Sequence, residues 1–228
     1  MIHVSPLVIL LLVFSIGSQC MSQDSKIDKL IESLANSSKT PTLDGAEGSR
    51  VSASKLGLDV QEQRHVVDVI RQIDLIWDEQ VWDRLVAHSD DGRYCLTTIN
   101  DNEFATNWTV GEVCSYLAEK QILDCINETL RSIPPPATRE HIGYSVDLFD
   151  GKSILEWRTI RKEKRFSDLQ LELASTAIDH LKNDKSISET ERDRATGELN
   201  KLRGRYERTV QSQFIRVRFI GEELRLPK

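Results

Sequence analysis

The stretch WRTIRKEKRFSDLQLELASTAIDHLKN, residues 157–183, decides the fold that the sequence predicts. Steps of three and four residues along it define one line of positions, and six of the eight are apolar. These positions are Trp157, Ile160, Lys164, Ser167, Leu171, Ala174, Ile178 and Leu181. Alternating steps of three and four are the heptad pattern of a helix that packs against another helix. We therefore expect one long helix from Trp157 through Asn183.

A second helix is expected to pack against the first. Residues 182–187 are polar and predict a turn, and Ser188 and Glu191 are spaced as a capping box that starts a helix. Apolar residues then recur at helical spacing, at Ala195, Leu199, Leu202, Tyr206, Val210, Phe214, Val217, Ile220 and Leu224. The pattern predicts an antiparallel helical hairpin with Leu171 and Leu199 in its core.

The front half of the chain predicts another helical hairpin. An apolar stripe at helical spacing indicates a helix that runs to about Ala87. Residues 95–108 are read as a loop or a short strand. Thr109 and Glu112 form a capping box for the next helix, which must end by Ile133 because three prolines follow.

The predicted fold class is all-α: an elongated antiparallel helical bundle, or coiled-coil hairpins, with a flexible N-terminal segment. The expected divisions of the chain are a signal peptide at 1–20, a short helix and flexible linker at 21–58, an N-terminal helical hairpin stapled by a disulfide at 59–133, a proline-rich connector at 134–151, and a long C-terminal helical hairpin at 152–228.

The first residues have the layout of a secretory signal peptide. An apolar run from Leu7 to Ile16 follows a short start and precedes small and polar residues. The run is about half the ~20 residues that a membrane span needs. Cleavage between Gly17 and Cys20 is expected. Three N-x-S/T sequons, at Asn36, Asn107 and Asn127, fit passage through the secretory route. We therefore expect a secreted, extracellular glycoprotein.

The cysteines predict a disulfide. Cleavage before Met21 leaves Cys95, Cys114 and Cys125, whereas cleavage before Ser18 also keeps Cys20. Cys114 and Cys125 lie on one predicted helix, ~16 Å apart along its axis, and a disulfide needs Cα atoms within ~7 Å. We therefore expect Cys95 to pair with Cys114, with Cys125 as the alternative partner.

Residue patterns that carry catalysis or bind metals do not stand out. The histidines are scattered and none forms HxxxH or HExxH spacing, and a glycine-rich phosphate loop and a GxSxG motif are missing. Adjacent carboxylates such as Asp90 and Asp91 fall on solvated stretches. We expect neither an enzyme nor a bound metal or cofactor.

Basic residues cluster toward the end of the chain. The net charge is −6, yet residues 192–228 carry 10 Lys and Arg against 5 Asp and Glu. One interpretation is a solvated helix face, and the other is a surface for glycosaminoglycans or anionic lipid. The candidate anion-binding residues are Arg158, Arg161, Lys162, Lys164, Arg165, Lys201, Arg203, Arg205, Arg208, Arg216 and Arg218.

These features together predict a secreted helical glycoprotein that binds a macromolecular partner, with an extracellular protein as the expected partner. The alternative is an amphipathic-helix lipid carrier, or a binder of anionic glycans or membrane surfaces, acting through the basic C-terminal helix. Nucleic acid is not expected as a partner, because the chain is acidic overall and has a secretory leader. A homodimer through the heptad seam or an unpaired cysteine is left open.

Overall fold

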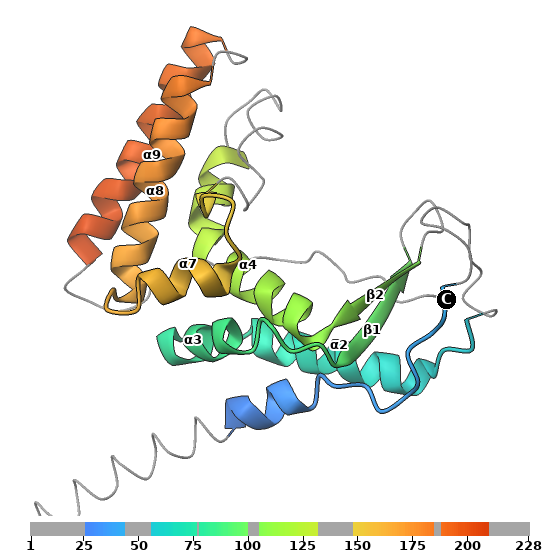
Figure 1. Cartoon of the computed structure of the whole chain (residues 1–228). Coiled ribbons are helices and arrows are strands. Elements are labelled where there is room, and N and C mark those ends of the chain that lie inside the picture. The colour runs from blue at the N-terminus through green and yellow to red at the C-terminus, as the bar shows by residue number, and fades with distance from the viewer. Residues whose placement is uncertain are drawn as a thin grey trace, which may run out of the picture. The chain divides into compact units, whose positions relative to one another are not determined.

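The computed structural model describes residues 26–43, 56–76, 78–99, 105–131, 148–184 and 188–209. Their elements, in chain order, are a short helix at residues 26–32, α2 (Val60–Asp74), α3 (Glu79–Ala87), β1 (Tyr94–Ile99), β2 (Ala105–Thr109), α4 (Val110–Arg131), α7 (Ile154–Ile160), α8 (Phe166–Asn183) and α9 (Glu189–Thr209) (Figure 1). The predicted leader and residues 210–228 lie outside the described residues.

The all-α prediction is wrong, because β1 and β2 pair as an antiparallel sheet (Figure 1). Thr97 lies opposite Asn107 and Thr98 opposite Thr106, and the register shifts between Tyr94 and Leu96. Threonine and isoleucine favour strands because a branched Cβ packs well on a pleated surface. The sequence allowed either a loop or a short strand at residues 95–108. The β-branched residues of this segment account for the strands that form.

The elongated coiled-coil bundle is not found either, because two of the long helices that the sequence predicted are each broken into two shorter ones. The stripe that runs to Ala87 is two helices: α2 ends at Asp74, and α3 starts at Glu79 with Asp78 as its N-cap. The Asp78 carboxylate accepts a hydrogen bond from the backbone N–H of Gln80 at 2.8 Å. A side chain that satisfies an orphan amide favours a new helix start over a continuous helix.

The chain divides into two compact units. The first holds residues 26–43, 56–76, 92–99 and 105–110, and the second holds residues 78–91, 111–131, 148–184 and 188–209. The predicted segment 59–133 thus contributes to both units. None of the described helices combines the length and the apolarity that a membrane span requires.

The core of the first unit contains apolar residues from the short helix at 26–32, from α2 and from the β1–β2 hairpin. The short helix at 26–32 buries Ile27 and Ile31. Helix α2 starts at the Asp59 cap and buries Val66, Val67, Val69, Ile70 and Ile73. This 3,4-type spacing places the buried residues on one side of the helix.

In the second unit, large aromatic side chains form the core between α3, α7 and the start of α8. The Trp82 and Phe166 rings meet edge to face at 5.1 Å, as do the Phe149 and Trp157 rings. Trp82 also donates its indole N–H to the Ala118 carbonyl of α4 at 3.0 Å. Edge-to-face packing suits buried aromatic rings, and the bond to Ala118 satisfies the buried indole N–H of Trp82.

Helix α4 starts where its backbone passes very close to the preceding segment. A Cβ on Gly111 would lie 2.7 Å from the Ser89 carbonyl oxygen, closer than real Cβ atoms approach, so only glycine fits here. From there α4 continues without a break to Arg131, which confirms the predicted helix within about two residues of its expected end.

Helices α8 and α9 lie side by side as a hairpin (Figure 1), which confirms the pairing expected for this region. Its core differs from the predicted seam. Leu199 is fully buried, as predicted, whereas Leu171 is only half-buried. The buried residues of α8 are Phe166, Leu169, Leu173, Ala174, Ala177, Ile178 and Leu181.

The seam was misplaced because residues 157–183 are two helices. Helix α7 ends at Ile160, whose side chain is 65% exposed, and α8 starts only at Phe166. A heptad line carried through the intervening turn loses its phase, so the predicted positions before the turn do not continue the core positions after it.

Candidate functional site

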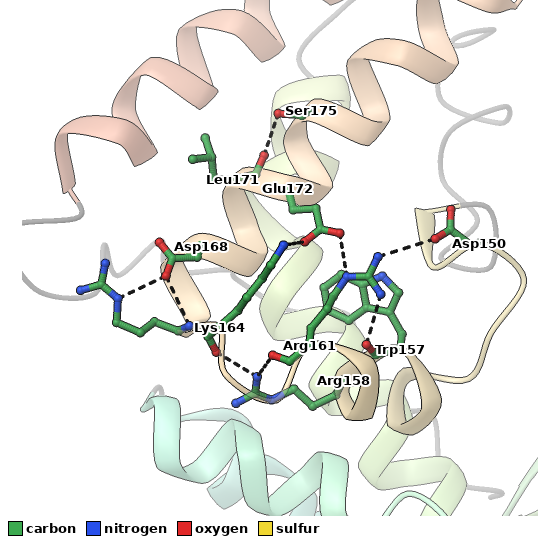
Figure 2. Close-up of polar contacts among 10 residues, drawn as sticks. Asp150, Trp157, Arg158, Arg161, Lys164, Asp168, Leu171, Glu172 and Ser175 are labelled. Carbon is green, nitrogen blue, oxygen red and sulfur yellow. Dashed lines mark hydrogen bonds and ion pairs between the residues drawn. The ribbon is translucent and has the colours of Figure 1, made fainter.

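The turn that joins α7 to α8 carries most of the predicted basic cluster, and we call residues 158–165 the α7–α8 corner (Figure 2). Helix α7 enters it from a capping box, in which Ser153 Oγ accepts from the Glu156 N–H at 3.2 Å and Glu156 Oε2 accepts from the Ser153 N–H at 3.1 Å. These local bonds fix the start of a seven-residue helix that is too short to be stable alone.

Arg158 links the corner to α3 and also binds backbone carbonyls of the corner itself. Its Nε and Nη2 bind the two carboxylate oxygens of Asp83 at 2.9 and 3.3 Å. Its Nη1 donates to the carbonyl oxygens of Arg161 and Lys164 at 2.8 and 2.9 Å. The guanidinium also lies 5.5 Å from the centre of the Trp82 ring. One planar five-donor group thus ties the turn to α3, which a lysine could not do.

Arg161 and Lys164 share one carboxylate (Figure 2). Arg161 Nε binds Glu172 Oε1 and Lys164 Nζ binds Glu172 Oε2, both at 2.6 Å. Arg161 also reaches Asp150 at 3.7 Å and lies 4.5 Å above the centre of the Trp157 ring. The carboxylate of α8 therefore anchors the corner at two points.

The charges of this network balance, since three cations face three carboxylates. Burial raises the pKa of the Glu172 carboxyl, but the hydrogen bonds from Lys164 and Arg161 outweigh burial, so its pKa lies below the ordinary value. The network thus holds Glu172 ionised at neutral pH. Because its cations are matched internally, the corner presents little net positive charge.

Other predicted anion-binding residues are also paired. Arg165 binds Asp168 at 3.2 Å, Lys201 binds Glu198 at 2.6 Å, and Arg203 binds Glu207 at 3.6 Å. Lys162 is exposed on the corner. Arg205 is exposed on α9. The Arg208 side chain, Arg216 and Arg218 lie outside the described residues. The structure therefore brings Arg158, Arg161 and Lys164 together, but as a brace with matched carboxylates.

The predicted disulfide is not formed among the described residues, and it stays a prediction. Cys95 and Cys114 are buried, and Cys125 is half-buried on α4 beside Tyr206 of α9. Burial raises the pKa of the Cys125 thiol and of the Tyr206 hydroxyl. A thiol with a raised pKa is a poor nucleophile at neutral pH, so Cys125 has the properties of a packing residue.

The three sequon asparagines differ in their surroundings. Asn36 and Asn107 lie in the first unit, half-buried and engaged in hydrogen bonds. Asn127 is half-buried on α4 of the second unit, next to the exposed Glu128.

Metal chemistry has no support in the described part of the chain, where no group of three or more His, Cys, Asp or Glu side chains is placed to hold an ion. Comparison with known protein families, with curated proteins and with solved structures finds no match.

The sequence identified the cations of the corner but missed their partners. Asp83 lies 75 residues before Arg158, and Glu172 lies 11 residues after Arg161. No local spacing rule links residues so far apart. The one available signal was the balance of the segment 152–191, which carries 8 basic and 8 acidic residues and so favoured internal pairing.

Proposed function

We propose that this protein is secreted and acts outside the cell by binding another protein rather than by catalysis. The leader at residues 1–20 and the three sequons support the compartment. The observation that carries the binding proposal is the α7–α8 corner. Its ion pairs and hydrogen bonds hold the turn in one conformation, so it is a fixed feature of the surface. Binding residues are typically presented on loops that a rigid scaffold positions.

The outer residues of the corner suit contact with a protein. Ile160 is 65% exposed, and Lys162 and Glu163 beside it are exposed and opposite in charge. An apolar side chain within a charged rim is the usual arrangement at the centre of a protein interface. The fixed turn also lowers the entropy that binding would cost.

The alternative partners, anionic glycans or lipid, have less support. An anion would have to displace Asp83 or Glu172 to reach Arg158 or Arg161, at the cost of short charge-assisted bonds. Among the residues with described side chains, Lys201 and Arg203 of α9 are also paired. What remains for this alternative is the exposed Lys162 and Arg205, together with the basic residues from Arg208 onward in the sequence.

The test is capture from the extracellular fluid that the protein meets, with three forms of the purified secreted chain. These are the wild type, Ile160→Asp at the corner, and Leu75→Asp as a matched control, since Leu75 is another strongly exposed apolar residue at a helix end. Captured proteins are quantified by mass spectrometry.

We expect at least one extracellular protein to be captured by the wild type and by Leu75→Asp, and about tenfold less by Ile160→Asp, which corresponds to ~1.4 kcal/mol. Equal capture by all three forms would remove the corner from the interface. Retention on heparin that moderate salt abolishes, or a gain of helicity with anionic vesicles, would favour the alternative.

A further inference from the structure

The sequon asparagine Asn107 belongs to the first unit of the fold and is half-buried. Asn107 is on β2, directly opposite Thr97 of β1, whose side chain is fully buried. Paired residues of an antiparallel sheet point to the same face, so Asn107 shares the face of Thr97. Its Oδ1 accepts from Thr97 Oγ1 at 2.7 Å, and its Nδ2 donates to the Pro41 carbonyl at 2.9 Å.

The Asn107 amide ends a chain of hydrogen bonds with a fixed direction. Gln63 Nε2 of α2 donates to the Tyr94 hydroxyl at 2.9 Å, and the Tyr94 and Thr97 hydroxyls are 2.7 Å apart. Thr97 uses its one hydroxyl hydrogen on Asn107, so Tyr94 must donate to Thr97. Gln63 completes a ring by accepting from the Thr97 backbone N–H at 3.0 Å.

The Pro41 carbonyl fixes which end of the Asn107 amide faces which partner. A carbonyl oxygen can only accept, so the amide nitrogen must face Pro41 and the amide oxygen must therefore face Thr97. Nδ2 is the atom to which an N-linked glycan would be attached. A bulky, hydrated sugar on that atom would have to be placed where α2, β1 and the segment at Pro41 meet. A glycan on this atom would therefore crowd the segment at Pro41 and disturb the hydrogen bond that Nδ2 makes there.

The other two sequons contrast with this one. The Asn36 Nδ2 is buried, its Oδ1 accepts from the Ser38 N–H at 2.8 Å, and its backbone N–H donates to the Tyr94 carbonyl at 2.9 Å. Asn127 is also half-buried, but it lies on α4 between the fully buried Ile126 and the exposed Glu128, at the edge of the solvated face.

We propose that Asn107 is a structural amide that joins β2 to the segment at Pro41, and that Asn127 is the residue that carries the N-linked glycan. The glycan half of this statement rests on the proposed secretion of the protein. The structural role of Asn107 does not depend on secretion, so the two parts of the proposal are tested separately.

The structural role is tested by thermal melting of unglycosylated protein made in bacteria. Asn107→Asp keeps the shape of the side chain but places an oxygen against the Pro41 carbonyl oxygen. It should lower the melting temperature by roughly 5 °C or more. Asn127→Asp is the matched control and should leave the melting temperature nearly unchanged. If Asn107→Asp does not fold, Thr97→Val is used in its place. It replaces the hydroxyl with a methyl group of similar size and should also lower the melting temperature.

The glycan position is tested on protein secreted by animal cells, by enzymatic release of N-glycans in ¹⁸O-labelled water and peptide mass spectrometry. We expect the label at Asn127 and unmodified Asn107. A glycan on Asn107 of folded protein, or equal melting temperatures for the Asn107→Asp and Asn127→Asp forms, overturns the proposal. Protein without any glycan overturns the assignment to Asn127 and counts against secretion, while the melting comparison still decides the role of Asn107.

Discussion

At the scale of single residues, Glu172 holds the α7–α8 corner together. Each of its carboxylate oxygens binds a different cation at 2.6 Å, one from Arg161 and one from Lys164. Removing it leaves Arg161, whose side chain is 16% exposed, with Asp150 at 3.7 Å as its remaining carboxylate partner, beside its contacts to the carbonyl and the ring of Trp157. An incompletely paired, poorly solvated charge costs more than the loss of an exposed ion pair.

We therefore predict that Glu172→Gln destabilises the protein at pH 7 by roughly 1–2 kcal/mol. The pKa of Glu172 is lowered in the folded state, so its contribution is full above the ordinary glutamate pKa and is lost as pH falls through the folded value. Denaturant melts of wild type and variant should consequently converge at acidic pH. Glu163→Gln, on the exposed side of the same corner, is the control and should match the wild type throughout. A constant gap between wild type and Glu172→Gln from pH 7 to strongly acidic pH would contradict the pairing.

At the scale of elements, the α8–α9 hairpin distinguishes two leucines that the sequence treated alike. Leu199 is fully buried, whereas Leu171 lies beside the core and is half-buried. We predict that Leu199→Ala costs ~2–5 kcal/mol of unfolding free energy. Leu171→Ala should cost less than about half of that, because part of its surface is already solvated. Equal losses in chemical denaturation would show that the two helices meet along the predicted seam.

Helix α4 limits how the cysteines can pair. It runs without interruption from Val110 to Arg131, so Cys114 and Cys125 are held ~16 Å apart along one axis. We predict that non-reducing peptide mapping of secreted protein finds Cys95 linked to Cys114, or less readily to Cys125. Such a staple closes a loop of roughly 20 residues, worth ~3 kcal/mol on the chain-entropy estimate. A mapped Cys114–Cys125 bond would require α4 to break near its middle.

The elements that the sequence could predict are those with strong local signals. The capping box and proline stop placed α4, and the polar turn with the Ser188 cap placed the start of α9. The break before Asp78 was missed because apolar residues continue at helical spacing through it. The strands were left open because β1 is short and its buried Thr97 is polar, so it lacks the clear apolar alternation of a half-buried strand. Of its partners, Gln63 lies 34 residues before Thr97, and Asn107 lies 10 residues after it, on the paired strand.

At the scale of the whole molecule, the two units each draw on separate parts of the sequence. Residues 92–99 and 105–110 belong with the first unit, although residues 78–91 before them belong with the second. Periodicity is a local property and cannot show that the chain leaves a unit and comes back to it. The sequence therefore predicted units made of consecutive residues. The aromatic core around Trp82 and Trp157 and the polar chain that ends at Asn107 both depend on these long-range returns.

Secretion is the claim on which the binding proposal and the glycan assignment both rest. Its most direct test is the intact mass and N-terminal sequence of protein collected from the medium of animal cells that express the full chain. The account predicts a chain that lacks its first ~17–20 residues and loses mass on removal of N-glycans. Protein that stays inside the cells with Met1 in place and no glycan would contradict the account.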